Sequence, residues 1–316
     1  MTFPTPYDGS SKLSQIGTKP LDPSDWLEPD AAMADQLAEK NRLLETHRDA
    51  VFAILPGSEA AQEELLTHLA DYLPTRFPHI WQREGNAMRI LPTDALVPLE
   101  GDDPKLLTAA RLVQDDLLLL ERDEDGWRLS AASLCFPSSW VLGEKIGKVL
   151  DQIHAPVPGF GPGTRSAQIM ARMFDATRPD MPMIRWNFSL YGDTRLFHPD
   201  VSGPGERRFG SGERADPVYM RVERQTLRKL PRTGAIAFTI RISLDPLDRL
   251  ESHPRGKDIA ASLIEQVEAL TPEQLDYKGL TLEKDRVITR LSKIARSSTA
   301  ALNVSVNPLH GDTPKA

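Results

Sequence analysis

Alternating apolar and polar positions predict three consecutive β-strands in the second half of the chain. Residues 184–190 place Ile, Trp, Phe and Leu on one face and Arg, Asn and Ser on the other, which is the pattern of a half-buried strand. Residues 218–227 and 235–242 follow across a short basic connection and predict an antiparallel pair. Earlier in the chain, residues 115–120 and 127–136 are apolar runs on either side of a Gly-containing turn. That arrangement predicts a β-hairpin.

Apolar residues at helical spacing predict helices before, between and after these strands. The predicted helices cover residues 30–55, 58–73, 104–112, 141–153, 164–174, 257–270, 272–275 and 284–295. Residues 192–217 are polar, rich in Gly and Pro and without period, which predicts a long loop. Because strands and helices are segregated along the chain, the sequence predicts an α+β domain with an antiparallel sheet.

Both ends of the chain lack such a period. Residues 1–29 predict an irregular arm in which Trp26 is the one aromatic of the stretch LDPSDWLEPD, and we expect Trp26 to pin the arm to the body. From about Asn303 onward the sequence predicts a disordered tail.

Composition and charge narrow the class of protein. The 316 residues carry a net charge of −7, which gives no electrostatic attraction to nucleic acid or to an anionic membrane. No apolar run approaches the ~20 residues of a membrane span. Cys135 is the single cysteine, so an internal disulfide and a cysteine-based zinc or iron–sulfur site are excluded. The N-terminus lacks the charged-then-apolar order of a secretion signal, so we expect a cytoplasmic location.

His154 has the most distinctive setting of the seven histidines. Pro156 restricts Ala155, so the helix predicted over 141–153 should end at about His154. Counting back in helical steps places Gly147 and Gly143 on the face from which His154 projects. Glycine inside a helix costs ~1 kcal/mol relative to alanine, so two of them indicate the close approach of a neighbouring backbone or of a flat cofactor. The histidine is then either a metal ligand or an ordinary core or surface residue.

A second candidate is the polar face of the strand over 218–227, formed by Tyr219, Arg221, Glu223 and Gln225. One interpretation is a solvent-exposed face, as antiparallel sheets often have. The other is a lined pocket, in which Glu223 pairs with a cationic ligand and Arg221 or Arg224 holds an anionic one.

The sequence RQTLRKLPR that follows is a basic cluster. It could dock an acidic partner or bind the carboxylates of a cofactor. The alternative is a solvent-exposed hairpin without a ligand. No nucleotide-binding fingerprint, HExxH or paired-cysteine motif is present.

Two stretches resemble a known family. FPSSWVLGEKIGKVLDQIHAPVPG (136–159) and RVERQTLRKLPRTGAIAFTI (221–240) are similar to the haem-dependent oxidative N-demethylases, specifically the haem-carrying α subunit of dimethylamine demethylase. The resemblance extends from roughly residue 20 to 295. It implies a PAS-like antiparallel sheet with flanking helices. The expected division is an N-terminal arm with helices (1–75), a PAS-like haem-binding core (76–250), C-terminal helices (251–300) and a flexible tail (301–316).

The resemblance also implies an activity and its cofactors. The chain would bind b-type haem, with His154 as the proximal ligand of the iron. Gly147, Gly143 and Arg224 are the further candidates for contact with the cofactor, from their places in the predicted helix and strand. A small secondary amine would be oxidised by O₂ to a primary amine and formaldehyde. NADPH, FMN and an iron–sulfur cluster would belong to separate reductase subunits. The missing nucleotide fingerprint and the single cysteine fit that division.

The alternation of side chains along the strand over 218–227 suggests which residues could act on the side of the haem opposite His154, and these roles are hypotheses. Glu223 would hold the amine, and Arg221 or Tyr219 would donate hydrogen bonds to bound oxygen or to haem carboxylates. Two alternatives remain open: a haem-based gas or redox sensor without turnover, and a protein that uses the pocket for another small ligand without haem.

Overall fold

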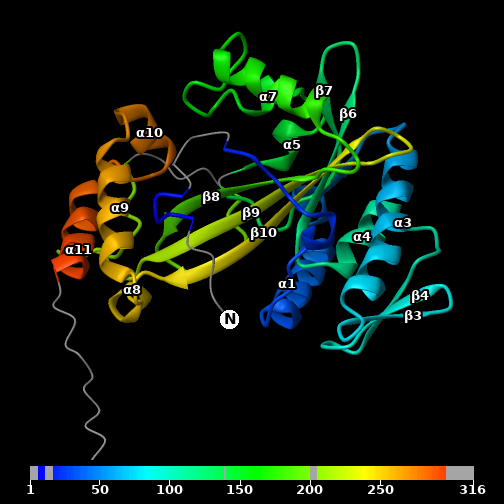
Figure 1. Ribbon diagram of the computed structural model, residues 1–316, viewed down its shortest axis with the longest axis horizontal. Helices are drawn as coiled ribbons and strands as arrows, with labels where there is room; N and C mark the ends of the chain where they lie inside the picture. The colour runs from blue at the N-terminus through cyan, green and yellow to red at the C-terminus, as the bar shows by residue number, and fades with distance from the viewer. Residues whose placement is uncertain (1–5, 11–16, 139, 200–204, 297–316) are drawn as a thin grey trace, which may run out of the picture.

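The central sheet contains seven antiparallel strands within the residues that the structure describes. The computed structural model describes residues 6–10, 17–138, 140–199 and 205–296. The strands follow the order β1-β8-β9-β10-β6-β7-β2 across the sheet (Figure 1). Their bounds are β1 Lys19–Pro20, β2 Phe52–Ile54, β6 Asp116–Arg122, β7 Trp127–Ser133, β8 Met183–Tyr191, β9 Tyr219–Lys229 and β10 Ile236–Pro246.

The predicted meander and the predicted hairpin are both confirmed, and they share this one sheet. Asn187 of β8 lies opposite Glu223 of β9, and Glu223 lies opposite Ile242 of β10. On its other edge β10 pairs with β6 and places Phe238 opposite Leu118. The two halves of the chain thereby build one continuous antiparallel surface.

Helices surround the sheet on several sides, as Figure 1 shows. At one end lie α1 Met33–Thr46, α2 Arg48–Val51, α3 Glu59–Arg76 and α4 Lys105–Leu112, with a small sheet of β3 Trp81–Glu84, β4 Ala87–Ile90 and β5 Ala95–Pro98. Above the sheet lie α5 Leu142–Lys145, α6 Leu150–Ile153 and α7 Arg165–Ala176. At the other end lie α8 Arg249–Ser252, α9 Gly256–Glu268, α10 Pro272–Tyr277 and α11 Lys284–Arg296. This order of elements confirms the α+β class.

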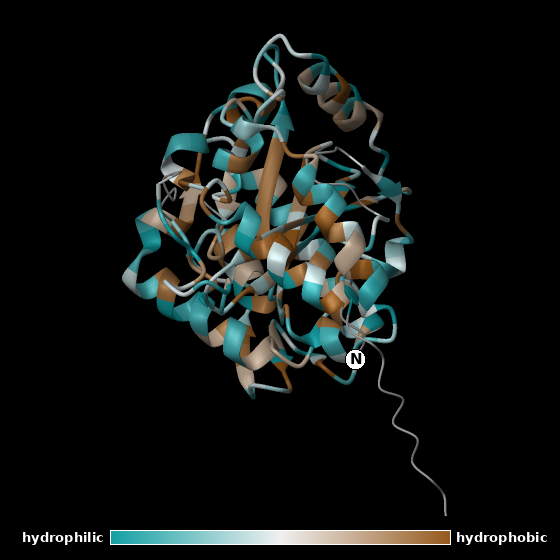
Figure 2. Cartoon of the chain, turned by 90° about the vertical axis from the view of Figure 1, so that its left-hand side faces the viewer, coloured by the Kyte–Doolittle hydropathy of each residue, from teal (hydrophilic) through white to brown (hydrophobic). Residues whose placement is uncertain are grey.

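The two faces of β8 and β9 have different partners. Phe188, Leu190, Met220 and Val222 are buried in one apolar cluster with side chains of α9 and α11. Since side chains alternate along a strand, the polar residues between them project to the opposite face. Figure 2 shows apolar strand segments near the centre of the molecule, surrounded by helices in which hydrophilic and hydrophobic residues alternate.

The N-terminal arm is attached as expected. The short 3₁₀ helix η1 Pro23–Asp25 leads to Trp26, whose side chain is 0% exposed and contacts the ring of Tyr72 with 5.3 Å between ring centroids. The guanidinium of Arg228 lies 4.6 Å from the centre of the Trp26 ring. Preceding η1, β1 pairs with β8. The tail expected from Asn303 lies outside the described residues.

Two predicted helices are wrong in their length. The helix expected over 30–55 ends at Thr46, and after the turn of α2 the chain enters β2, which pairs with β7. The helix expected over 141–153 is broken into α5 and α6. Gly147 between them has a φ of 79°, in the left-handed region that favours glycine. Its amide donates to the carbonyl of Leu129 in β7, so the chain here follows the sheet edge instead of continuing a helix.

Among the described helices, none has both the length and the apolar character needed to cross a bilayer.

Candidate functional site

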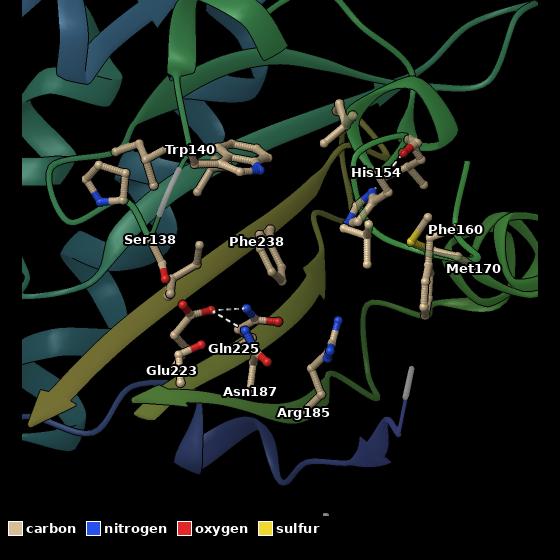
Figure 3. Close-up of a pocket in the computed structure, with 18 of the residues that line it drawn as sticks. Ser138, Trp140, His154, Phe160, Met170, Arg185, Asn187, Glu223, Gln225 and Phe238 are labelled. Atoms are coloured by element: carbon tan, nitrogen blue, oxygen red, sulfur yellow. Dashed lines mark hydrogen bonds between the residues drawn. The ribbon is translucent and has the colours of Figure 1, made fainter. Parts of the chain in front are cut away.

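A cavity lies between the sheet and the segment that carries α5, α6 and α7 (Figure 3). Its floor is formed by side chains of β6, β7, β8, β9 and β10, and its opposite wall by residues 136–174. Tyr277, Lys278 and Arg208 complete it from α10 and the long loop. The polar face predicted on β9 therefore lines a pocket, and the alternative of a solvent-exposed face is wrong for Glu223 and Gln225, each 7% exposed.

One end of the cavity is apolar. Leu118 and Leu120 of β6 and Phe238 of β10 form its floor, facing Met170 and Phe174 of α7. Leu129 and Ile240 extend the floor, and Trp140, Phe160 and Met173 extend the opposite wall. Broad apolar surfaces of this kind bind the flat faces of aromatic ligands.

His154 lies at this apolar end, immediately after α6 (Figure 3). Its Nδ1 is 2.7 Å from the carbonyl oxygen of Leu150. Because a carbonyl only accepts hydrogen bonds, Nδ1 carries the proton and Nε2 keeps its lone pair. Burial lowers the pKa of His154 to about 4, while the hydrogen bond to Leu150 opposes the shift. The side chain is thus a neutral, oriented imidazole, the form in which histidine binds a metal.

Gly143 and Gly147 do not share a helical face with His154, because the expected helix is broken. Neither glycine lines the cavity. A Cβ built on Gly143 would meet no atom within 4 Å, and one on Gly147 would meet only Leu55 at 3.8 Å. No described residue approaches either glycine as closely as expected. Gly147 instead allows the chain to turn between α5 and α6 through its positive φ.

The other end of the cavity is polar and centred on Glu223 (Figure 3). Asn187 Nδ2 donates to Glu223 Oε2 at 3.1 Å, and Gln225 Nε2 donates to the same oxygen at 2.8 Å. Lys278 Nζ donates to Asn187 Oδ1 at 3.4 Å and to the carbonyl oxygen of Phe188 at 3.0 Å. These contacts hold the largely buried carboxylate of Glu223 in a fixed position.

Lys278 is the buried cation of this network, with 8% of its surface exposed. Burial lowers its pKa to about 8, although the nearby carboxylate of Glu223 opposes the shift. At neutral pH Lys278 therefore keeps its positive charge.

The other predicted residues of β9 have different positions. Arg221 is fully buried and donates to the carbonyl oxygen of Phe136 at 2.7 Å, so it supports the wall segment without lining the cavity. Tyr219, at the start of β9, is also not part of the lining. Arg224 directly follows Glu223 in β9, so its side chain projects to the opposite face of the sheet. There it donates to the carbonyl oxygen of Trp26 and pairs with Glu28 at 3.0 Å.

Arg208 is a cation at the cavity that sequence analysis missed. Its guanidinium lies 5.4 Å from the centre of the Tyr191 ring, and no described residue accepts a hydrogen bond from it. Gly279 makes this position possible, because a Cβ there would lie 2.3 Å from Arg208 Cζ. The backbone amide of Arg208 is held by the buried carboxylate of Glu283 at 2.8 Å. A glycine and a buried acid thus combine to place one arginine beside the cavity.

The lining fits a haem. A flat macrocycle needs apolar walls and an axial ligand. The apolar end offers such walls, and His154 would be the residue to hold the iron. Among the described residues, the cavity also carries the positive charges of Arg185, Arg208 and Lys278 against the single negative charge of Glu223. The two carboxylates of a haem would balance that excess. An apolar pocket that presents a neutral histidine and surplus cations among its described residues is the kind of site found in haem-binding proteins.

Comparison with known families agrees with this class. A family model described as haem-dependent oxidative N-demethylase, alpha subunit-like, matches residues 17–288. The chain belongs to this family, and the resemblance noted in the sequence is confirmed. The family's name denotes a haem-dependent oxidoreductase, and its description as an α subunit indicates a complex of several subunits.

Proposed function

We propose that this chain holds b-type haem through His154 and removes a methyl group from a small secondary amine such as dimethylamine. One amine, one O₂, two electrons and two protons would give methylamine, formaldehyde and water. The observation that carries the proposal is the orientation of His154: its Nδ1 is bound to the carbonyl of Leu150, and Nε2 is left for the iron. The family match supports it independently.

When bound, the haem supplies oxygen activation and electron transfer. The protein's own residues would bind and orient the amine. The pKa of a dialkylamine in water is far above neutral, so the substrate arrives as a cation. Glu223 is the one carboxylate that lines the cavity within the part of the chain that the structure describes. Phe238 lies between Glu223 and His154 (Figure 3) and offers an apolar surface to the methyl groups.

The electrons would come from NADPH through a separate reductase subunit that carries FMN and an iron–sulfur cluster. The α-subunit description of the family supports such a partner.

The test is a product assay on the haem-loaded chain. The protein is incubated aerobically with NADPH, a surrogate flavin and iron–sulfur reductase, and dimethylamine, and formaldehyde and methylamine are quantified. We expect the two products in equal amounts and in excess over enzyme. Reduction and O₂ binding without amine-dependent product would contradict the proposal and favour a sensor.

A further inference from the structure

The carboxylate of Glu223 has one occupied oxygen and one available oxygen. Both amide donors, from Asn187 and Gln225, reach Oε2. No described residue donates a hydrogen bond to Oε1, although the side chain lines the cavity. A carboxylate oxygen has two lone-pair sites, so Oε1 can accept an N–H of a bound cation.

Gln225 presents a second oxygen that lacks a donor. Since a carboxylate only accepts hydrogen bonds, the amide nitrogen of Gln225 must face Glu223, and its Oε1 must point away. Figure 3 shows this carbonyl oxygen on the side turned away from Glu223. Gln225 Oε1 is buried and has no hydrogen-bond partner among the described residues. A buried acceptor without a donor is unfavourable, which indicates that a ligand supplies the donor.

The rest of the network fixes this amide orientation. Asn187 is held from both sides, because Lys278 donates to its Oδ1 while its own Nδ2 donates to Glu223. Asn187 can therefore not turn its oxygen toward Gln225 without losing both contacts. Two acceptors on one face of β9, Glu223 Oε1 and Gln225 Oε1, are thus available together in the cavity.

We propose that Gln225 determines specificity for amines with two N–H donors. The inference rests on the proposed function and deepens it. A dialkylammonium ion has two N–H groups, one for Glu223 Oε1 and one for Gln225 Oε1. A trialkylammonium ion has only one, so it leaves Gln225 Oε1 buried and unpaired. Sites that hydrogen-bond a ligand group discriminate strongly against analogues that lack that group.

The test compares the dissociation constants of dimethylamine and trimethylamine, measured by optical titration of the haem-loaded protein. One hydrogen bond to a charged group corresponds to about tenfold or more in affinity. We expect the wild type to bind dimethylamine at least about tenfold more tightly than trimethylamine. Gln225→Met keeps the length of the side chain but removes the acceptor, and should reduce this ratio to within about threefold.

Asn187→Leu is the matched control, because it removes the other donor to Glu223 Oε2 and leaves Gln225 Oε1 in place. It should weaken both amines and keep their ratio. Haem content and the far-ultraviolet circular dichroism spectrum of Gln225→Met, each equal to that of the wild type, guard against a misfolded methionine variant.

The failures are distinguishable. An unchanged ratio in Gln225→Met, or an equal loss of preference in Gln225→Met and Asn187→Leu, would overturn the role of Gln225 while leaving the proposed function intact. If the wild type binds neither amine, both the proposed function and the role of Gln225 are wrong.

Discussion

The substitution Glu223→Gln tests the amine site with little change of shape. In the wild type, Glu223 Oε2 accepts from Asn187 and Gln225. A glutamine at this position keeps one oxygen for those two donors and turns an NH₂ group toward the cavity. The surrounding network therefore stays satisfied, while the negative charge and the acceptor for the amine are both lost.

The magnitude follows from the contact that is removed. Hydrogen bonds to charged groups contribute roughly 1.5–3 kcal/mol, and 1.4 kcal/mol corresponds to tenfold in affinity. Glu223 is only 7% exposed, so bulk solvent screens the lost contact little. We expect the dissociation constant of dimethylamine to rise about 10- to 150-fold.

The assay is the amine-induced shift of the haem spectrum, with haem content measured on the same samples. Haem content should be unchanged, because His154 lies at the other end of the cavity. The control is Glu144→Gln, an identical chemical change on the exposed surface of α5 outside the lining. It should leave amine affinity within twofold. Equal amine affinity in the wild type and Glu223→Gln would refute the role of Glu223.

Three further predictions concern haem retention, pH and stability. Arg208→Ala should speed haem transfer to apomyoglobin several-fold, whereas exposed Arg207→Ala should not; equal rates would show that Arg208 does not hold a haem carboxylate. Folding lowers the pKa of Lys278 from 10.5 to about 8. Between pH 8 and pH 10.5, therefore, the unfolded chain keeps this proton and the folded chain has lost it. The free energy of unfolding of the haem-free protein should then rise by about 3 kcal/mol as the pH increases across this window. Urea denaturation of Lys278→Met should lack that rise. Trp26→Ala should lower the free energy of unfolding by roughly 3–5 kcal/mol, because the side chain is 0% exposed; a loss below 1 kcal/mol would show that the arm is not pinned there.

Strand alternation made much of the sheet predictable. The apolar period of β8 and β10 and the polar face of β9 are local properties of the sequence, and the structure confirms them. The same rule could have excluded Arg224, which is adjacent to Glu223 and must face the opposite side. The rule identified Glu223 and Gln225 but could not tell an exposed face from a lined pocket, because the covering segment comes from elsewhere in the chain.

The missed features depend on tertiary contacts. Arg208 comes from a loop without period and reaches the cavity only because Gly279 leaves space for it. Lys278 follows a short helix, and its burial depends on acceptors in β8, including the carbonyl of Phe188. The helix predicted before His154 is interrupted because Gly147 adopts a positive φ and its amide donates to the carbonyl of Leu129 in β7. This contact with the sheet depends on the tertiary fold and is not visible in the helical pattern of the sequence.

The central claim is that His154 binds the iron of a haem, and the absorption spectrum of the purified chain with added haem tests it most directly. We predict a strong Soret band in the wild type. In His154→Gly the spectrum should change to that of a haem without the protein ligand, and added imidazole should restore it. A wild type that stays colourless, or a His154→Gly variant with unchanged axial coordination, would contradict the account.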